Sequence, residues 1–361
     1  MYKNWFSPSQ EFQDIPRGHS DSSFGHSLQT FDHFQINPKG SKIALVGYEA
    51  KMANRVRSSL FRLESPWKSL PIVDLGNLRK QDPNFAIQAG KALVADGIIP
   101  LFIGGSEDLS RVLLESFQEY RSHINLVLVD QDLNAFRIDK GYWQNVLQGA
   151  GHLKDISLMA YQSHFLSQSE TSLLEDRFLD ILRLGQIRKN PEASEPVARN
   201  ADIISINLNV IRYSDCPEQK IPSSNGLFGE ELCRISRYAG ISDKLRAFAI
   251  HGIGEMSEGF SPGADIMAQC IWYFVDGVMA RRSDFPVSTG HLREYLVDHQ
   301  SFDDQISFWK SDLTGRWWVQ LWGDEEDPKK AKMIPCTLED YQLASNDELS
   351  ERLLRFLQRL A

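Results

Sequence analysis

Three stretches of this chain share one pattern, in which an apolar run that predicts a buried strand breaks abruptly into polar side chains. They are IIPLFIGGSEDLS at 98–110, INLVLVDQDLN at 124–134 and ADIISINLNV at 201–210. Continuous apolar runs of this kind are typical of strands buried on both faces of a parallel sheet. Because the carboxyl ends of parallel strands meet at one edge, where open α/β sheets hold their ligands, we expect the polar residues to form a single site.

The segments around these strands alternate between strand and helix patterns. Further strands are expected at 42–47, 71–77, 156–162 and 247–255, and helices at 85–97, about 107–120, 169–185, 228–240 and 264–282. Strands that alternate with helices through short glycine turns predict βαβ units and a parallel sheet. The expected fold is α/β, a three-layer α-β-α sandwich with a mostly parallel, doubly wound sheet.

The chain divides into three parts that differ in composition and in apolar periodicity. Residues 1–40 are polar and aromatic without clear periodicity, which indicates an N-terminal arm. Residues 41–282 carry the alternating pattern and form the α/β domain. Residues 283–361 hold the Trp317–Trp318 pair and end in an amphipathic helix pattern, so we expect a C-terminal extension packed on the domain or at an interface.

Composition excludes several classes of function. The net charge of −9 and the lack of a Lys and Arg cluster argue against nucleic acid as a partner. No apolar run approaches the ~20 residues of a membrane span, and the N-terminus lacks a signal-peptide pattern, so we expect no membrane partner and a cytoplasmic location. The four cysteines lie far apart without a CxxC pair, which favours reduced, buried thiols.

Taken in order, GGSEDLS, DQDLN and SINLN resemble the motifs GGDHS, DAHxD and SxDxD of the ureohydrolase family, which comprises arginase, agmatinase and formimidoylglutamase. The resemblance covers roughly residues 40–282, and the tail with its RWW and IPCTLEDY stretches resembles a formimidoylglutamase-like branch. It implies an arginase-like fold, a homo-oligomer, and hydrolysis of C–N bonds of linear amidines by a hydroxide that bridges two manganese ions.

Six side chains stand where the family has its metal ligands. They are Glu107 for the first histidine, Asp130, Asp132 and Asn134 for the Asp-His-Asp of the second motif, and Asn207 and Asn209 for the two aspartates of the third. The three acids here supply a ligand charge of about −3, where the family supplies about −4, and each carboxylate lost removes attraction for a divalent ion. The resemblance therefore implies a degenerate manganese site.

Three arrangements of this cluster remain open. In the expected one, no cofactor is bound, because the asparagine amides donate hydrogen bonds to the carboxylates and Arg137 or Arg212 completes the neutralisation. At least one carboxylate of such a network should have a raised pKa. Alternatively, the all-oxygen set holds one hard cation, Mg²⁺ or Ca²⁺, and two manganese ions are the remaining alternative.

Four further residues are candidates for the site. Glu255, in GIGEMSEG, corresponds to the glutamate with which the family binds the guanidinium or amidine of its substrate. His251 lies on the strand that ends beside Glu255, and Arg212 stands where the family motif continues with Asp, so both are substrate-binding candidates. His164 falls near the family's proton-shuttling residue and joins Glu255 as a catalytic candidate. The structural alternatives are a loop histidine for His164 and a satisfied core histidine for His251.

Three functional hypotheses follow. The first is a pseudoenzyme, a ureohydrolase-fold protein that has lost the dinuclear manganese site and binds a small cationic amidine or guanidine. The alternative is an active formimidoylglutamase-type or agmatinase-type hydrolase with an altered metal site. The third is a structural role in which the arm and the tail are presented to a partner.

Overall fold

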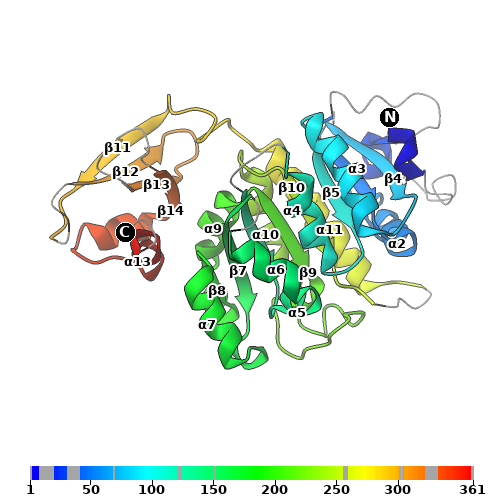
Figure 1. Ribbon diagram of the computed structural model, residues 1–361. Coiled ribbons are helices and arrows are strands. Elements are labelled where there is room, and N and C mark those ends of the chain that lie inside the picture. The colour runs from blue at the N-terminus through cyan, green and yellow to red at the C-terminus, as the bar shows by residue number, and fades with distance from the viewer. Residues whose placement is uncertain are drawn as a thin grey trace.

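A broad sheet forms the centre of the protein (Figure 1). The computed structural model describes residues 2–7, 20–30, 41–67, 70–119, 124–149, 152–254, 259–300, 302, 305–321 and 332–358. Within these residues the sheet has ten strands, of which nine follow one path and β2 (Gln29–Thr30) pairs with β4 beside it. The path runs β1 (Phe6–Ser7), β4 (Ile72–Leu78), β3 (Ile43–Gly47), β5 (Ile99–Ile103), β10 (Ala247–His251), β9 (Ile203–Asn207), β6 (Ile124–Val129), β7 (Leu153–Tyr161) and β8 (Ile181–Arg183).

The strand directions confirm the expected sheet. β1 runs antiparallel to β4, and the other pairs described in this sheet are parallel. The strands β3, β5, β6, β9 and β10 are buried along their whole length. This burial explains why their sequences are nearly continuous apolar runs.

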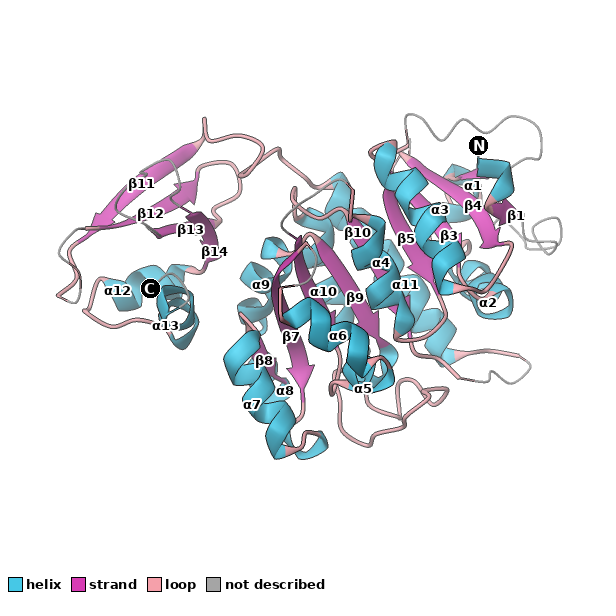
Figure 2. Ribbon diagram, in the orientation of Figure 1, coloured by secondary structure: helices cyan, strands magenta, loops and turns pink. Residues whose placement is uncertain are grey.

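Helices cover both faces of the sheet, as Figure 2 shows, and a separate apolar cluster fills each interface. One face packs against α2 (Ala50–Leu60), α8 (Leu184–Lys189), α9 (Ser194–Asn200), α10 (Gly229–Ile241) and α11 (Pro262–Met279). The other packs against α3 (Pro83–Ala95), α4 (Asp108–Ser116), α5 (Asn134–Ile138), α6 (Lys140–Leu147) and α7 (Gln168–Arg177). The three-layer α-β-α sandwich is thus confirmed. In the described part of the chain, no helix has both the length and the apolar character needed to cross a bilayer.

The helix expected over 169–185 is shorter than its pattern indicated. A capping box of Ser167 and Glu170 begins α7, but the helix ends at Arg177 and the chain becomes extended at Phe178. The main chain then pairs with β7, where Leu179 donates to the Ile156 carbonyl oxygen. Burial of Phe178 and Leu179, at 1% and 2% exposure, stabilises this strand conformation against the helical periodicity.

The C-terminal segment contains a second sheet that the sequence pattern did not predict. Its antiparallel strands are β11 (Leu292–Val297), β12 (Ile306–Ser311), β13 (Trp317–Leu321) and β14 (Lys332–Cys336), followed by α12 (Leu338–Ala344) and α13 (Glu351–Gln358). This unit has its own apolar cluster and lies beside the α9 and β8 end of the α/β domain (Figure 1). Arg352 joins the two parts, with its Nε 2.6 Å from Asp180 Oδ1.

Candidate functional site

The polar ends of β5, β6 and β9 meet at one edge of the sheet, as the sequence predicted. The strands lie in the order β5, β10, β9 and β6, so the segments that follow them are neighbours. All six residues at the metal-ligand positions are at this edge, which we call the rim cluster: Glu107, Asp130, Asp132, Asn134, Asn207 and Asn209. Its three acids are each 6% exposed, so their charges are largely removed from water.

Asp130, the first residue after β6, is bonded to the last residue of β9. Asn207 donates from Nδ2 to Asp130 Oδ2 at 2.9 Å, and the Gln131 main-chain N–H donates to Asp130 Oδ1 at 2.7 Å. Burial, followed by the charge of Asp132, nevertheless raises the pKa of Asp130 well above its usual range. The expectation that one carboxylate of the cluster has a raised pKa agrees with this environment.

The amide of Asn134 connects the β5 and β6 ends of the rim. Its Nδ2 donates to Glu107 Oε1 at 3.0 Å, and its main-chain N–H donates to Asp132 Oδ1 at 2.9 Å. The second bond forms because Asp132 and Asn134 bracket the start of α5, where main-chain N–H groups lack helical partners. One asparagine therefore holds two acids of the rim cluster.

Arg137 supplies the cation of the cluster. Its Nη1 donates to Asp132 Oδ2 at 2.7 Å, and its Nε donates to Glu170 Oε1 at 2.7 Å. Partial burial of Glu170 raises its pKa, but hydrogen bonds from Arg137 and Ser167 outweigh this and lower it to about 2. Of the two arginines weighed for neutralisation, Arg137 reaches the rim acids. A cavity of about 590 Å³ adjoins the cluster on the Arg137 side, between α5, α6 and α7.

His251, at the end of β10, stands between the two halves of the rim. It is 2% exposed, and its Nε2 lies 3.1 Å from Ser205 Oγ, which in turn accepts from Ser110 Oγ at 2.9 Å. Its Nδ1 has no hydrogen-bond partner in the described residues. Burial lowers the pKa of His251 to about 4, although the Glu107 charge acts in the opposite direction. The ring is therefore neutral at pH 7, with one nitrogen unpaired.

Gln131 is a rim residue that the sequence comparison passed over. Its side chain is 1% exposed, and neither its Oε1 nor its Nε2 has a partner in the described part of the chain. A buried amide with both groups unpaired is rare and points to a ligand or water contact. The sequence offered one sign of this residue: it lies between Asp130 and Asp132, at a position where the family motif has the small residue alanine.

The other candidates lie apart from the rim cluster or outside the description. His164 is exposed in a short turn and its ring lies tilted against that of Phe165. Arg212 donates from Nε to Asp215 Oδ1 at 2.8 Å and lies over the Phe228 ring, so a local pair occupies it. Glu255 lies outside the described residues, which stop at Gly254 and resume at Gly259.

The rim side chains do not fit a pair of manganese ions as they are arranged. The carboxylates that would bridge two cations accept instead from Asn207, Asn134 and Arg137. The amide oxygens of Asn207 and Asn209 accept from the main-chain N–H groups of Asn209 and Ile221. In the described ranges, no group of three or more His, Cys, Asp or Glu side chains is placed to hold a metal.

Comparisons with known proteins identify the fold. No protein-family model matches the sequence, and no curated protein matches it. Among solved structures, formiminoglutamase from Trypanosoma cruzi with two Mn²⁺ is 16% identical and matches over 69% of this chain and 97% of its own, with a TM-score of 0.60. Formimidoylglutamase from Bacillus subtilis is 17% identical over 70% and 91% of the two chains, with a TM-score of 0.58. Agmatine ureohydrolase from Thermoplasma volcanium is 15% identical over 74% and 96%, with a TM-score of 0.53.

These neighbours correct the expected cofactor. The Trypanosoma cruzi enzyme was solved with two Mn²⁺. The expectation of no cofactor, with one Mg²⁺ or Ca²⁺ ion as the first alternative and two manganese ions as the last, is contradicted by this comparison, because the similar structure holds manganese. The resemblance read from the three motifs is confirmed, and the protein has the α/β fold of the arginase superfamily.

Proposed function

We propose that this protein is a non-catalytic binding protein of arginase fold, whose rim cluster takes a small cationic amidine or guanidine. The observation that carries the proposal is the pairing of all three rim acids with donors of the chain itself. Asp130 is held by Asn207, Glu107 by Asn134, and Asp132 by Arg137.

The same pairing argues against hydrolysis. In the family that the motifs resemble, the nucleophile is a hydroxide bridging two metal ions, and a low-pKa water depends on that charge. The carboxylate oxygens needed for the bridge are bonded to amide and guanidinium groups here. His251 is a poor general base at neutral pH, because burial lowers its pKa to about 4.

The charge and the unpaired atoms of the rim favour a cationic ligand. Three acids converge here, and among the described residues Arg137 is the arginine that reaches them and is shared with Glu170. The acceptor Gln131 Oε1 has no donor in the described residues, and the neighbouring His251 Nδ1 has no partner there either. The N–H groups of an amidinium or guanidinium match acceptors of this kind, and a buried acceptor left unpaired costs about 1–3 kcal/mol.

A turnover assay tests the catalytic half of the proposal. Formiminoglutamate, agmatine and arginine are each incubated with the protein in saturating Mn²⁺, and formamide, ammonia and urea are measured. We expect no release above background. The matched control carries Glu107→His, Asp132→His, Asn134→Asp, Asn207→Asp and Asn209→Asp, which restore the family pattern. Turnover by the wild-type chain would replace this proposal with the hydrolase alternative.

A thermal-shift comparison tests the binding half. Arginine and citrulline have nearly the same shape but differ in side-chain charge. Arginine should raise the unfolding temperature and citrulline should not, since a ligand at 100 times its Kd adds about 2.7 kcal/mol of stability. Glu107→Gln should reduce the arginine shift. Equal shifts with the two ligands would show that the rim does not select a cation.

A further inference from the structure

A second cavity lies at the opposite end of the sheet, between the α/β domain and the C-terminal unit. Its volume is about 400 Å³. The domain contributes Asn125 and Lys154 from the amino-terminal parts of β6 and β7, and Asn200 and Lys244 from the segments that precede β9 and β10. Strands rise ~3.3 Å per residue, which places Asn125 about 16 Å along β6 from Asp130 of the rim cluster. The cavity is therefore separate from the rim.

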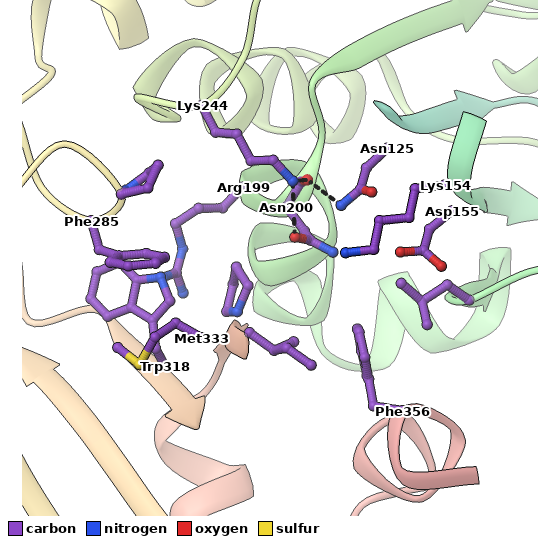
Figure 3. Close-up of a pocket in the computed structure, with 14 residues that line it drawn as sticks. Asn125, Lys154, Asp155, Arg199, Asn200, Lys244, Phe285, Trp318, Met333 and Phe356 are labelled. Carbon is purple, nitrogen blue, oxygen red and sulfur yellow. Dashed lines mark hydrogen bonds between the residues drawn. The ribbon is translucent and has the colours of Figure 1, made fainter. Parts of the chain in front are cut away.

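The walls of this cavity differ sharply in chemistry (Figure 3). Cations and amides lie on the domain side, and a single acid, Asp155, lines the cavity with them. The C-terminal side and the preceding loop are apolar. Their lining residues include Phe285, Trp318, Met333, Ile334, Pro335 and Phe356.

Arg199 is the buried cation of the polar wall. Its side chain is 3% exposed and lies over the Trp318 ring, with Cζ 4.4 Å from the ring centroid. Nε donates to Glu195 Oε1 at 2.8 Å, and Nη2 donates to Glu195 Oε2 and to the carbonyl oxygens of Trp317 and Cys336. Nη1 has no hydrogen-bond partner in the described residues. The Nη1 group of this buried guanidinium, which lines the cavity, therefore has no acceptor among the described residues.

The cavity lining carries three cations, Arg199, Lys154 and Lys244, and one acid, Asp155. Glu195 is shared between two guanidiniums, since Arg316 Nε also lies 3.6 Å from Glu195 Oε1. Asp243 and Asp284 act electrostatically on Arg316, but neither lines the cavity. The lining is thus net positive in a chain that has 48 acidic and 39 basic residues.

Two lysines extend the positive wall towards the mouth. Lys244 donates from Nζ to the Asn200 carbonyl oxygen at 2.5 Å and lies 3.3 Å from Asp202, which offsets part of its charge. Asn125 Nδ2 donates to the same carbonyl oxygen at 3.1 Å, so the amides and the lysine form one fixed frame (Figure 3). Lys154 is exposed at the edge of this frame.

We propose that this cavity binds a small organic anion, with a carboxylate or phosphate on the wall of Arg199, Lys244 and Lys154 and an apolar body against Trp318 and Phe285. A volume of about 400 Å³ is within the range of small-molecule sites, which combine an apolar lining with a few polar groups that fix orientation. Charged donors bind carboxylate and phosphate more strongly than neutral ligands, so charge sets selectivity and the aromatic wall sets affinity.

Four probes test the proposal on the full chain by titration calorimetry. They are 2-naphthoate, its neutral amide, phenyl phosphate and inorganic phosphate. We expect 2-naphthoate or phenyl phosphate to bind about tenfold more tightly than 2-naphthamide, and the better of the two identifies the anion. Inorganic phosphate alone should bind most weakly of the anions, because it lacks the apolar body. Equal affinity for naphthoate and naphthamide, or no binding of any organic probe at millimolar concentration, would overturn the proposal.

Two variants distinguish the contributions of the two walls to binding. Neither replaces Arg199, because Arg199 also donates to main-chain carbonyl groups of the C-terminal unit. Lys154→Glu should weaken naphthoate about fivefold and leave naphthamide unchanged, whereas Phe285→Ala should weaken both equally. Lys51→Glu, an exposed lysine on α2, is the matched control for net charge. If Lys51→Glu and Lys154→Glu have the same effect, the anion is not bound at this cavity.

A methyl spectrum locates the ligand. The chain has seven methionines, so ¹³C-methyl labelling gives a small set of signals. Met333 lines the cavity, and its signal is identified with Met333→Leu. Naphthoate should shift the Met333 signal and leave those of Met52 and Met159, which belong to the domain core, in place. A shift confined to the other methionines would contradict the assignment.

Discussion

The Asn207 amide donates to the Asp130 carboxylate across the boundary between β9 and β6, with 2.9 Å between Nδ2 and Oδ2. Both side chains are almost fully buried, at 1% and 6% exposure. In the motifs that this chain resembles, the position of Asn207 is an aspartate, and two facing carboxylates there would require a cation. Here the Asn207 amide donates a hydrogen bond to Asp130 instead, so the two side chains pair without a cation between them.

Asn207→Asp should therefore destabilise the protein and increase its response to manganese. A second buried carboxylate beside Asp130 loses the hydrogen bond and adds like-charge repulsion, which should cost about 2–4 kcal/mol at neutral pH. Added Mn²⁺ should raise the unfolding temperature of the variant more than that of the wild type. Asn145→Asp, exposed on α6, is the control, and the same manganese response in all three proteins would refute the pairing argument.

The raised pKa of Asp130 predicts how stability changes with pH. Between its usual value of 3.8 and the higher value in the folded state, the native protein binds the proton and the unfolded chain does not. The Asp130 contribution to the unfolding free energy is thus full below pH 3.8 and is lost as pH rises through the folded pKa. The difference between wild type and Asp130→Asn, measured by urea unfolding from pH 3.5 to 8, should fall as pH rises. A difference that stays constant over this range would contradict the prediction.

His251 should change the pH dependence of the unfolding free energy in the direction opposite to Asp130. Its pKa of about 4 in the folded state lies below the usual 6.5, so between these values the unfolded chain binds the proton. Its contribution is full above pH 6.5 and is lost as pH falls towards 4. The imidazole nitrogen shifts of His251, identified with His251→Gln, should show a neutral ring down to about pH 5. Titration near 6.5 would mean that water reaches the ring.

A buried ion pair between α2 and β4 should have a large effect on stability. Arg57 and Asp74 are both fully buried, and Arg57 Nε lies 2.8 Å from Asp74 Oδ2. Arg57→Leu leaves the carboxylate without its cation and should cost about 3–5 kcal/mol. Arg293→Leu breaks an exposed pair with Asp312 at 3.3 Å and should cost less than about 1 kcal/mol. Similar losses in chemical denaturation would show that burial of the first pair carries no special penalty.

The sequence predicted the rim because strand identity and rim position depend on the same local pattern. Apolar runs that break into Glu107, Asp130 and Asn207 define both the buried strands and the ends at which they meet. It also indicated Arg137 as a neutralising cation. The same reasoning placed Arg212 there too, since sequence alone does not show that Arg212 pairs with Asp215, three residues ahead.

Other features depend on contacts that a single sequence does not display. The segment 178–183 has helical periodicity, but it pairs with β7, and that strand is more than fifteen residues earlier in the chain. The C-terminal sheet combines short strands from 292–336, and its tie to Arg199 joins residues 118 and 137 positions apart. The unpaired amide of Gln131 likewise becomes visible only when its surroundings are known.

The capping box of α7 shares an acid with the rim. Glu170 accepts from the Ser167 hydroxyl and main-chain N–H, and it also accepts from Arg137, which reaches Asp132. Arg137 therefore links a buried acid of the rim to the solvent-exposed first turn of α7, and its removal would take a hydrogen-bond donor from both.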